Sequence, residues 1–554
     1  MINTPPSAPS LLYPAGANRH IGGRPAPSEP DLALTSIIRA LDYDGRHGRF
    51  VAGVLAELNA DPAIIGYRQA ALDDLLRLPE LVTSCAAVLP QLGELANAGR
   101  ASHWSDPIPL VQIAGRLAEL DGYVTCVEEL AAALDAAGAA LCSKAFCALR
   151  AYLANTRAQP DYRRLAEELP RLRAQLDQAG SVTLGINLDG QLRPASATIV
   201  AINPGRFAGK GSLLEKLFGE RAAADMVRGI TALYKAEEGR QRSPEHDLFR
   251  DLDRLLERVA APIGEALGSY ARVNGAGLAA LEPELTFYLG AARLVHELGA
   301  AGLALCRPEI APADERICAV EGAYNLDLAL RLRLASGGAT LAQKIVPNAI
   351  AFGRDALVFI LTGPNSGGKT TYTRAIGQIQ VLFQAGLHVP GRHARVSPVD
   401  GIFSHFAEPE RADIGAGRLA DELERLAQIF RQASRNSLVL LNEPLSSTDH
   451  GAARALCRDV LAGLQLLGAR AIVVTHLYEL VDDALDDPSL PGVVSLVAGV
   501  GAPAGNGVAP EPSYTIAAGR PQVGGYAAEL ARRHGLSRDQ IAATLRERSL
   551  GGEK

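Results

Sequence analysis

The stretch Ile360-Leu361-Thr362-Gly363-Pro364-Asn365-Ser366-Gly367-Gly368-Lys369-Thr370-Thr371 decides how this sequence is interpreted. An apolar run leads directly into a glycine-rich turn that ends in Lys-Thr-Thr. In such a turn the backbone N–H groups surround a phosphate, the lysine neutralises β- and γ-phosphate oxygens, and the next hydroxyl binds Mg²⁺. A purely structural turn has no need of Lys followed by two hydroxyl residues, so the stretch predicts a phosphate-binding loop. The residues expected to contact the nucleotide are Gly363, Pro364, Asn365, Ser366, Gly367, Gly368, Lys369, Thr370 and Thr371.

Short apolar runs follow a strand pattern on both sides of this loop. Runs at 356–362, 438–442 and 471–475 are separated by segments of helical composition. Buried parallel strands read as continuous apolar runs, and helices between them cover both faces of the sheet. Residues 305–554 are therefore expected to form an α/β P-loop ATPase domain.

The preceding part of the chain is mainly helical. Apolar residues recur at three- and four-residue steps over 31–180 and again over 211–302, and an Asp-Gly turn between two alternating segments predicts a β-hairpin near 181–203. We expect a mainly α-helical domain over 31–304 that contains this small hairpin. Residues 1–30 are rich in proline and are expected to be a disordered tail.

Size and composition set the broad class. A chain of 554 residues has room for about two to four domains, because single cores stop growing at about 250–300 residues. No run approaches the ~18 apolar residues of a membrane helix and the chain starts without an export signal, so we expect a cytoplasmic protein with no membrane contact. The seven scattered cysteines suggest buried reduced thiols. The net charge of −6 argues against a wholly polybasic nucleic-acid binder but leaves a local basic surface open.

Polar residues end the second and third predicted strands. Glu443 is the predicted general base, which would orient water for attack on the γ-phosphate, and Asn442 precedes it where Mg²⁺ is supported. His476 ends the third strand and is a candidate sensor of the γ-phosphate or of the attacking water. Asp449 could contact a partner subunit's active site or cap the helix that starts at His450, and the sequence leaves both open.

The segments 363–371, 412–430, 438–449 and 475–480 together resemble the ATPase domain of the MutS mismatch-repair family. The resemblance is strong over 305–545 and weaker in the helical half. It implies an ABC-type P-loop fold, a core and lever domain, and a homodimer with composite ATP sites and levers that reach toward DNA. It also implies a dimerising helix-turn-helix, formed by the predicted helix at 526–534 and one after the Ser537-to-Gln540 capping pattern.

The resemblance assigns further site residues, and the sequence departs from the family at several of them. Ile345 stands where an aromatic residue commonly stacks on adenine, and Asn348 lies in the approach to the nucleotide. In the signature segment, Gly417 replaces a Ser, so backbone N–H groups and Arg418 are left to meet the partner's γ-phosphate. Asn442 replaces an Asp, which suggests slow hydrolysis. Because only the proline-rich tail precedes the helical core, we expect no counterpart of the family's mismatch-reading domain.

We therefore expect a dimeric MutS-like ATPase that uses ATP and Mg²⁺ and acts on DNA in repair or recombination. Its catalytic residues would be Glu443, His476 and Lys369, and Thr370, Asn442 and Glu443 would support the metal. The alternative is a nucleotide-switched protein-interaction module with little hydrolysis and no DNA binding; a small-molecule kinase fits less well. The candidate DNA contacts, for which an ordinary solvated surface is the more frequent explanation, are Arg157, Arg163, Arg164, Arg171, Arg173, Lys210, Lys216, Arg221, Arg240 and Arg242.

Overall fold

The computed structural model divides the chain into two compact units, 1–8 with 87–136 and 149–282, and 9–86 with 137–148 and 283–554. The border expected near residue 305 differs from this division, because helices before it pack with the sheet-containing unit: α1 and α3 contact α16, and α2 contacts α14. The residues that the structure describes are 8–17, 28–101, 109–177, 181–188, 190–191, 194–203, 263–270, 273, 275–336, 340–406, 418–500, 512–521, 532 and 534–550.

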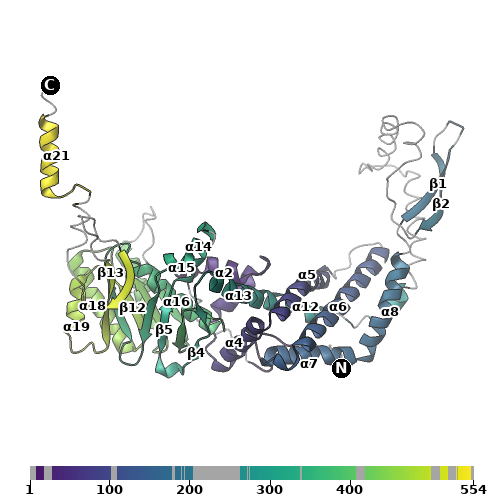
Figure 1. The fold of residues 1–554 in the computed structure, drawn as a ribbon, viewed down its shortest axis with the longest axis horizontal. Helices are drawn as coiled ribbons and strands as arrows, with labels where there is room; N and C mark the ends of the chain where they lie inside the picture. The colour runs from purple at the N-terminus through teal and green to yellow at the C-terminus, as the bar shows by residue number, and fades with distance from the viewer. Residues whose placement is uncertain are drawn as a thin grey trace. The chain divides into compact units, whose positions relative to one another are not determined.

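The first unit is mainly helical and carries the β-hairpin (Figure 1). Strand β1 pairs antiparallel with β2. Leu120, Val127 and Leu165 are fully buried in this unit, as the apolar spacing of its helices requires. Most of the second helical block expected over 211–302 lies outside the described residues. The elements wholly or largely in this unit are α5 (Pro79–Ala101), α6 (Pro109–Ala137), α7 (Lys144–Ala158), α8 (Pro160–Asp177), β1 (Ser181–Leu188), β2 (Pro194–Asn203) and α12 (Ala276–Ala279).

A six-stranded sheet organises the second unit. Its order is β10-β11-β12-β7-β13-β14, in which the first five strands run parallel and β14 is antiparallel to β13. The three predicted strands correspond to β7, β11 and β12, which confirms the parallel sheet. Asn442 pairs in register with Val474, and Val474 with Leu361, so the three strands end at one edge. The strands are β7 (Val358–Thr362), β10 (Ile402–Phe406), β11 (Leu438–Asn442), β12 (Arg470–Val474), β13 (Val493–Val500) and β14 (Pro512–Ala518).

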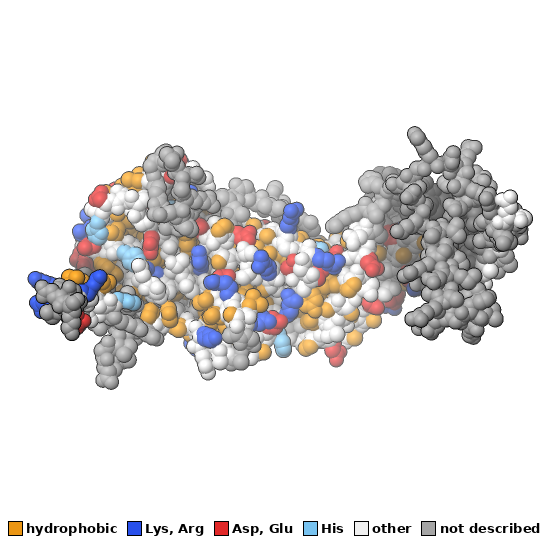
Figure 2. Space-filling model, turned by 90° about the horizontal axis from the view of Figure 1, so that it is seen from above, with side chains coloured by type: hydrophobic (Ala, Val, Ile, Leu, Met, Phe, Trp, Pro, Cys, Tyr) orange, Lys and Arg blue, Asp and Glu red, His pale blue; other side chains and the backbone are white. Residues whose placement is uncertain are grey.

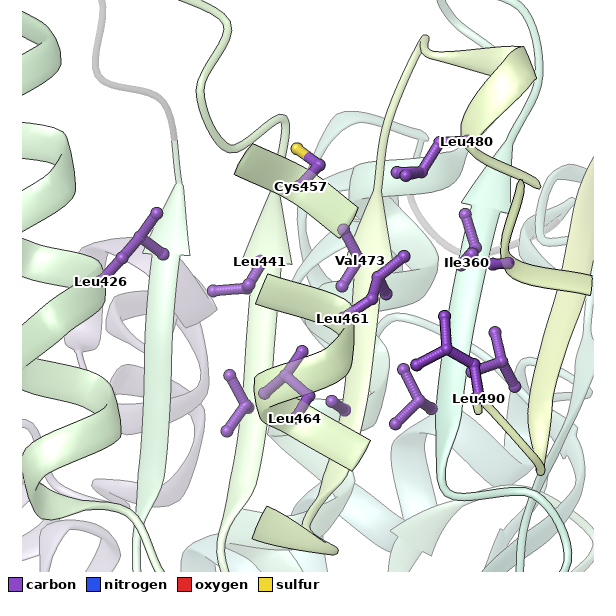
Figure 3. Close-up of a cluster of buried hydrophobic side chains, with 14 of the residues drawn as sticks. Ile360, Leu426, Leu441, Cys457, Leu461, Leu464, Val473, Leu480 and Leu490 are labelled. Atoms are coloured by element: carbon purple, nitrogen blue, oxygen red, sulfur yellow. The ribbon is translucent and has the colours of Figure 1, made fainter. Parts of the chain in front are cut away.

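Helices cover both faces of this sheet. Ile360, Leu441 and Val473 point from three strands into the core on the side of α18, where Leu461 and Leu464 meet them (Figure 3). Neighbouring residues of a strand point to opposite faces, so the other face packs against α16. The covering helices are α16 (Lys369–Gln384), α17 (Arg418–Gln432), α18 (His450–Leu467) and α19 (Tyr478–Leu485).

Buried glutamines attach α16 to the N-terminal helices of the same unit. The Gln378 amide donates to the carbonyl of Leu32 at 2.9 Å, and the Gln384 amide donates to the carbonyl of Leu58 at 2.9 Å. Both glutamine side chains belong to fully buried residues, so these hydrogen bonds replace water that the core excludes. The helix behind the glycine-rich loop is thereby fixed to residues 28–68.

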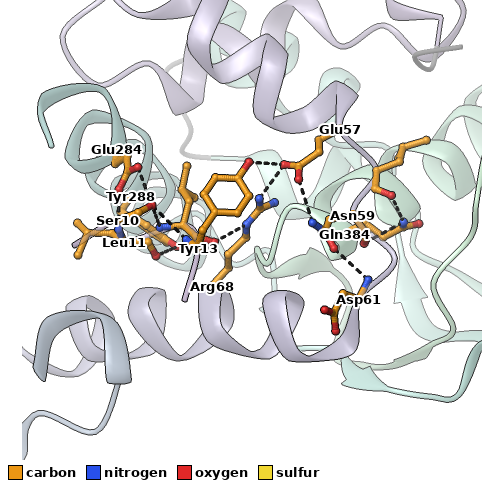
Figure 4. Close-up of polar contacts among 12 residues, drawn as sticks. Ser10, Leu11, Tyr13, Glu57, Asn59, Asp61, Arg68, Glu284, Tyr288 and Gln384 are labelled. Carbon is orange, nitrogen blue, oxygen red and sulfur yellow. Dashed lines mark hydrogen bonds and ion pairs between the residues drawn. The ribbon is translucent and has the colours of Figure 1, made fainter. Parts of the chain in front are cut away.

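Residues 9–17 are folded as part of the second unit, so the expected disordered tail is wrong for this part. Leu11 and Leu12 are buried, and the Glu284 carboxylate accepts hydrogen bonds from Ser10 Oγ at 2.8 Å and from the Leu11 N–H at 2.5 Å. Arg68 donates to Glu57 at 2.7 Å and to the Leu12 carbonyl at 3.1 Å (Figure 4). Three consecutive residues, two leucines and Tyr13, supply the apolar surface that outweighs the flanking prolines.

Smaller elements complete the second unit. Strands β4, β9, β5 and β6 form a four-stranded sheet, and β3 pairs with β8. Among the described residues, no helix combines the length and apolar character needed to cross a membrane. These elements are α1 (Glu29–Leu32), α2 (Thr35–Leu41), α3 (Gly48–Ala56), α4 (Pro62–Arg77), α13 (Glu282–Ala300), β3 (Leu305–Cys306), β4 (Glu309–Ile310), β5 (Cys318–Ala323), α14 (Leu326–Ser336), α15 (Leu341–Lys344), β6 (Asn348–Phe352), β8 (Val389–Pro390), β9 (His393–Val396) and α21 (Arg538–Leu550).

The predicted capping box and the cysteine prediction have different outcomes. Ser537 Oγ accepts from the Gln540 N–H and the Gln540 side chain accepts from the Ser537 N–H, both at 3.3 Å, which confirms the cap at the start of α21. Most of the helix expected at 526–534 lies outside the described residues. The cysteines are free, and Cys85, Cys126, Cys318 and Cys457 are buried as expected, whereas Cys306 is partly exposed and Cys142 and Cys147 are exposed.

Candidate nucleotide-binding and hydrolysis site

The glycine-rich loop joins β7 to α16 as the sequence predicts. Gly363 has φ +134° and Gly368, the residue before α16, has φ +90°; other residues rarely adopt these values. A Cβ at Gly363 would lie 2.8 Å from that of Ala498, so the loop also has no space for a side chain there. Because α16 begins at Lys369, its free N-terminal N–H groups lie directly behind the loop, an arrangement that favours an anion.

Lys369 points into the loop. Its Nζ donates to the carbonyl oxygens of Gly363 and Pro364, both at 3.0 Å, and lies 3.4 Å from His476 Nε2. The residue is only 5% exposed. Burial lowers the pKa of Lys369, and the nearby Glu443 carboxylate opposes this effect. The lysine is thus held by neutral loop carbonyls at the place where the sequence expects phosphate oxygens.

The ends of β11 and β12 bring the other candidates to the same edge. Thr370 Oγ1 donates to Asn442 Oδ1 at 3.1 Å, and Glu443 Oε1 lies 3.2 Å from His476 Nε2. Glu443 has φ +56°, a left-handed conformation held by its N–H, which donates to the Val474 carbonyl at 2.9 Å. The structure therefore gathers all the predicted catalytic and metal-supporting residues into one cluster.

His476 is the central residue of this cluster. Burial lowers its pKa, the Lys369 ammonium lowers it further, and Glu443 acts in the opposite direction. The ring is therefore neutral at pH 7. A neutral Nε2 either accepts from Lys369 or donates to Glu443, but not both, so the two tautomers satisfy different neighbours.

A cavity of about 630 Å³ opens beside the loop. Its size is typical of small-molecule and cofactor sites. Its polar side is the glycine-rich loop with Glu443, and its apolar side includes Leu328, Leu332 and Ile345. Ile345 thus lines the same cavity as the loop, and the cavity offers both the polar and the apolar surface that a nucleotide needs.

Asn348 and Tyr514 also line this cavity. The Asn348 amide donates to the Tyr514 carbonyl at 3.0 Å and accepts from the Ile516 N–H at 2.6 Å, so its polar atoms attach β6 to β14. Tyr514 has φ +57°, is half exposed, and packs against Gly368. Sequence reasoning missed Tyr514, because a tyrosine in a strand far from the loop carries no motif; its backbone strain is the signal that identifies it.

The remaining candidates are only partly placed. Arg418 is the first residue of α17, whereas Gly417 lies outside the described residues. Asp449 accepts from the Ala452 N–H at 3.0 Å and caps α18, which corresponds to the second of its two expected roles.

The basic candidates that the structure describes lie among acidic residues. Arg157 pairs with Glu128 and Asp135, and Arg173 pairs with Asp121. Lys and Arg are scattered among Asp and Glu on the face shown in Figure 2. Surface pairing therefore explains several of these residues without DNA, while Lys210, Lys216, Arg221, Arg240 and Arg242 lie outside the described residues.

Comparison with known proteins gives two family matches and several relatives. Residues 60–301 match the MutS2 N-terminal domain, and residues 359–494 match MutS domain V. Proteins named endonuclease MutS2 are 29% identical over 53% of this chain in Thermomicrobium roseum and 31% identical over 41% in Latilactobacillus sakei. These matches span 34% and 26% of the relatives, so the chain covers about a third or less of their length. The second family match includes the loop, Asn442, Glu443 and His476.

Proposed function

We propose that this chain, a member of the MutS family, binds and hydrolyses ATP as a dimer and uses the nucleotide to control its contact with DNA. The observation that carries the proposal is the cluster at the sheet edge: Lys369 in the loop, with Glu443 and His476 beside it. The mixed polar and apolar cavity at this edge has the size and chemistry for ATP.

The residues of the cluster divide the work of hydrolysis. Lys369 offsets negative charge on the transferred phosphate, and Glu443 orients the attacking water and accepts its proton. His476 lies within hydrogen-bonding distance of Lys369 and near Glu443, so it can register whether the γ-phosphate is present by changing tautomer. The left-handed backbone at Glu443, which persists only where the surroundings hold it, supports this role.

The donor set at Thr370 fits Mg²⁺. A hydroxyl, the Asn442 amide oxygen and the Glu443 carboxylate are hard oxygen ligands, and Thr370 and Asn442 are already in contact at 3.1 Å. When bound with ATP, Mg²⁺ would supply charge neutralisation on the phosphates. An amide carries no net charge, so Asn442 would hold the metal less firmly than a carboxylate, which supports slow turnover.

Two substitutions test the ATPase assignment. Lys369→Ala should abolish ATP binding in calorimetry, and Glu443→Gln should bind ATP but not turn it over. Lys144→Ala, which changes an exposed lysine at the start of α7, is the matched control. Unchanged turnover in either site variant would show that the chemistry happens elsewhere.

Dimer formation is supported by the family and by the terminal helix. Leu536, Ile541 and Leu545 on or next to α21 are 64%, 41% and 55% exposed, an apolar surface that pairing with a second copy would bury. Sedimentation should show a dimer that Ile541→Asp with Leu545→Asp converts to monomer. A wild-type monomer at micromolar concentration would refute this part.

DNA binding is supported by family membership alone, and Asn442 favours the rival, a nucleotide-switched protein-binding module. Arg164 and Arg171 are exposed on α8 and provide the test. Binding to duplex, mismatched and branched DNA should weaken steeply as the salt concentration rises. Replacing both arginines should reduce the slope of log affinity against log salt by the equivalent of about two phosphate contacts. Absent or salt-insensitive binding would favour the rival.

A further inference from the structure

Glu422 on α17 connects three elements at the edge of the sheet that carries the nucleotide cluster. Its Oε1 accepts from the Leu445 N–H at 2.6 Å and lies 2.9 Å from His405 Nε2. Its Oε2 accepts from Ser447 Oγ at 2.8 Å. The side chains of Glu422 and His405 are 11% and 6% exposed, so this contact is largely shielded from water. Both carboxylate oxygens are occupied by specific partners.

The loop that Glu422 holds is the one that begins with Glu443. This loop runs from the end of β11 to the start of α18, and it has left-handed backbone at Glu443 and Leu445, with φ +56° and +62°. Such values are unfavourable for residues with a side chain and persist only where the surroundings fix them. Leu445 is fully buried, so its N–H needs a partner within the protein, and Glu422 provides it.

Glu422 also belongs to the helix that begins with Arg418, the candidate for contact with a partner's γ-phosphate. Helix α17 starts at Arg418, four residues earlier, which is about one helical turn. A rotation or shift of α17 would therefore move Arg418 and the anchor of the Glu443 loop together. His405 belongs to β10, so its contact with Glu422 also links α17 to the sheet.

We infer that Glu422 is a positioning residue for ATP hydrolysis: it fixes the loop that presents Glu443 and couples that loop to the position of α17. This inference rests on the proposed ATPase function. Glu422 does not touch the nucleotide cavity, so it acts on turnover and leaves nucleotide binding in place. A group that only stabilised the fold would change both together.

The test compares two substitutions at Glu422 with a neighbour in the full-length chain. Glu422→Gln keeps an oxygen for one donor but loses the second acceptor, and Glu422→Ala removes both. We expect kcat to fall about 10-fold for Gln and about 100-fold for Ala, because small displacements of a catalytic group have effects of this order. The Kd for ATP should stay within about threefold of wild type.

Glu424→Ala is the matched control. It removes a carboxylate from the same helix, but the Glu424 side chain is 55% exposed and pairs with Arg431 on the surface. This variant should keep both kcat and the Kd for ATP. Thermal unfolding of all variants shows whether the fold is intact.

The outcomes separate the possible roles of Glu422. If Glu422→Ala keeps kcat within about twofold of wild type while Glu443→Gln abolishes turnover, Glu422 is not a positioning residue although the ATPase assignment stands. If Glu422→Gln and Glu422→Ala lose ATP binding, turnover and thermal stability in parallel, the role is structural and the inference is also overturned. A wild-type chain that does not bind ATP overturns the proposed function itself.

Discussion

Replacing Arg68 with Met should strongly destabilise the sheet-containing unit. Arg68 is fully buried, donates to Glu57 at 2.7 Å and to the Leu12 carbonyl at 3.1 Å, and its guanidinium lies 4.8 Å from the centre of the Tyr13 ring. Methionine fills similar aliphatic space but leaves the Glu57 carboxylate, 5% exposed, without its cation. Removing one partner of a buried ion pair costs about 3–5 kcal/mol in the free energy of unfolding.

A double-substitution cycle measures this coupling by urea unfolding followed with circular dichroism. Glu57→Gln in the Arg68→Met background removes the unpaired charge, so the double variant should recover to within about 1–2 kcal/mol of wild type. Ser10 and Tyr13 should become accessible to protease in Arg68→Met first, because Arg68 holds the chain at Leu12.

The cost should also depend on pH. Burial alone would raise the pKa of Glu57, but attraction to Arg68 and hydrogen bonds from Arg68, Tyr13 and Asn59 lower it below its usual 4.5. A lowered carboxyl pKa contributes stability above 4.5 that is lost as the pH falls through the folded-state value. The difference between wild type and Arg68→Met should therefore shrink in acid. A loss below about 1 kcal/mol at pH 7, or one independent of pH, would refute the reasoning.

Three further results are expected. Asn442→Asp should tighten Mg²⁺ binding and raise turnover, because it adds a negative charge to the oxygen ligands. A magnesium titration of hydrolysis checks this. The result would be contradicted if wild type reached half-maximal hydrolysis at a lower Mg²⁺ concentration than the variant. The lowered pKa of His476 keeps its ring neutral at pH 7, so hydrolysis should decline only as the pH falls below 6.5, and His476→Gln should remove that decline from the pH profile. Gly377→Val should destabilise the unit by about 1–3 kcal/mol in thermal unfolding, since even a Cβ would lie 2.5 Å from a Leu32 methyl, whereas the exposed Gly451→Ala should not.

The sequence was sufficient to predict the cluster because parallel strands end together. Once the runs before Gly363, Asn442 and His476 are assigned to parallel strands, their polar end residues must meet at one edge. The strand order of the sheet adds only that β12 lies between β7 and β11, which places His476 between Lys369 and Glu443.

Contacts over long sequence separations could not be predicted. Ser10 reaches Glu284 across 274 residues, and Tyr514 reaches Asn348 across 166, without any pattern that relates the two positions. The partner of Glu422 is a backbone N–H whose availability depends on the left-handed turn at Leu445. Every residue except proline carries the same backbone N–H donor, so the residue type does not signal such a contact.

The glutamine contacts between α16 and residues 28–68 have a practical consequence for experiments on this chain. Amide hydrogen bonds buried in a core carry no net charge, so dissolved ions neither screen nor compete for them. Ionic strength can therefore be varied widely in a titration with nucleic acid while the glutamine hydrogen bonds between α16 and residues 28–68 stay intact. A change in affinity over that range then reports on charges at the surface and not on the loss of these internal contacts.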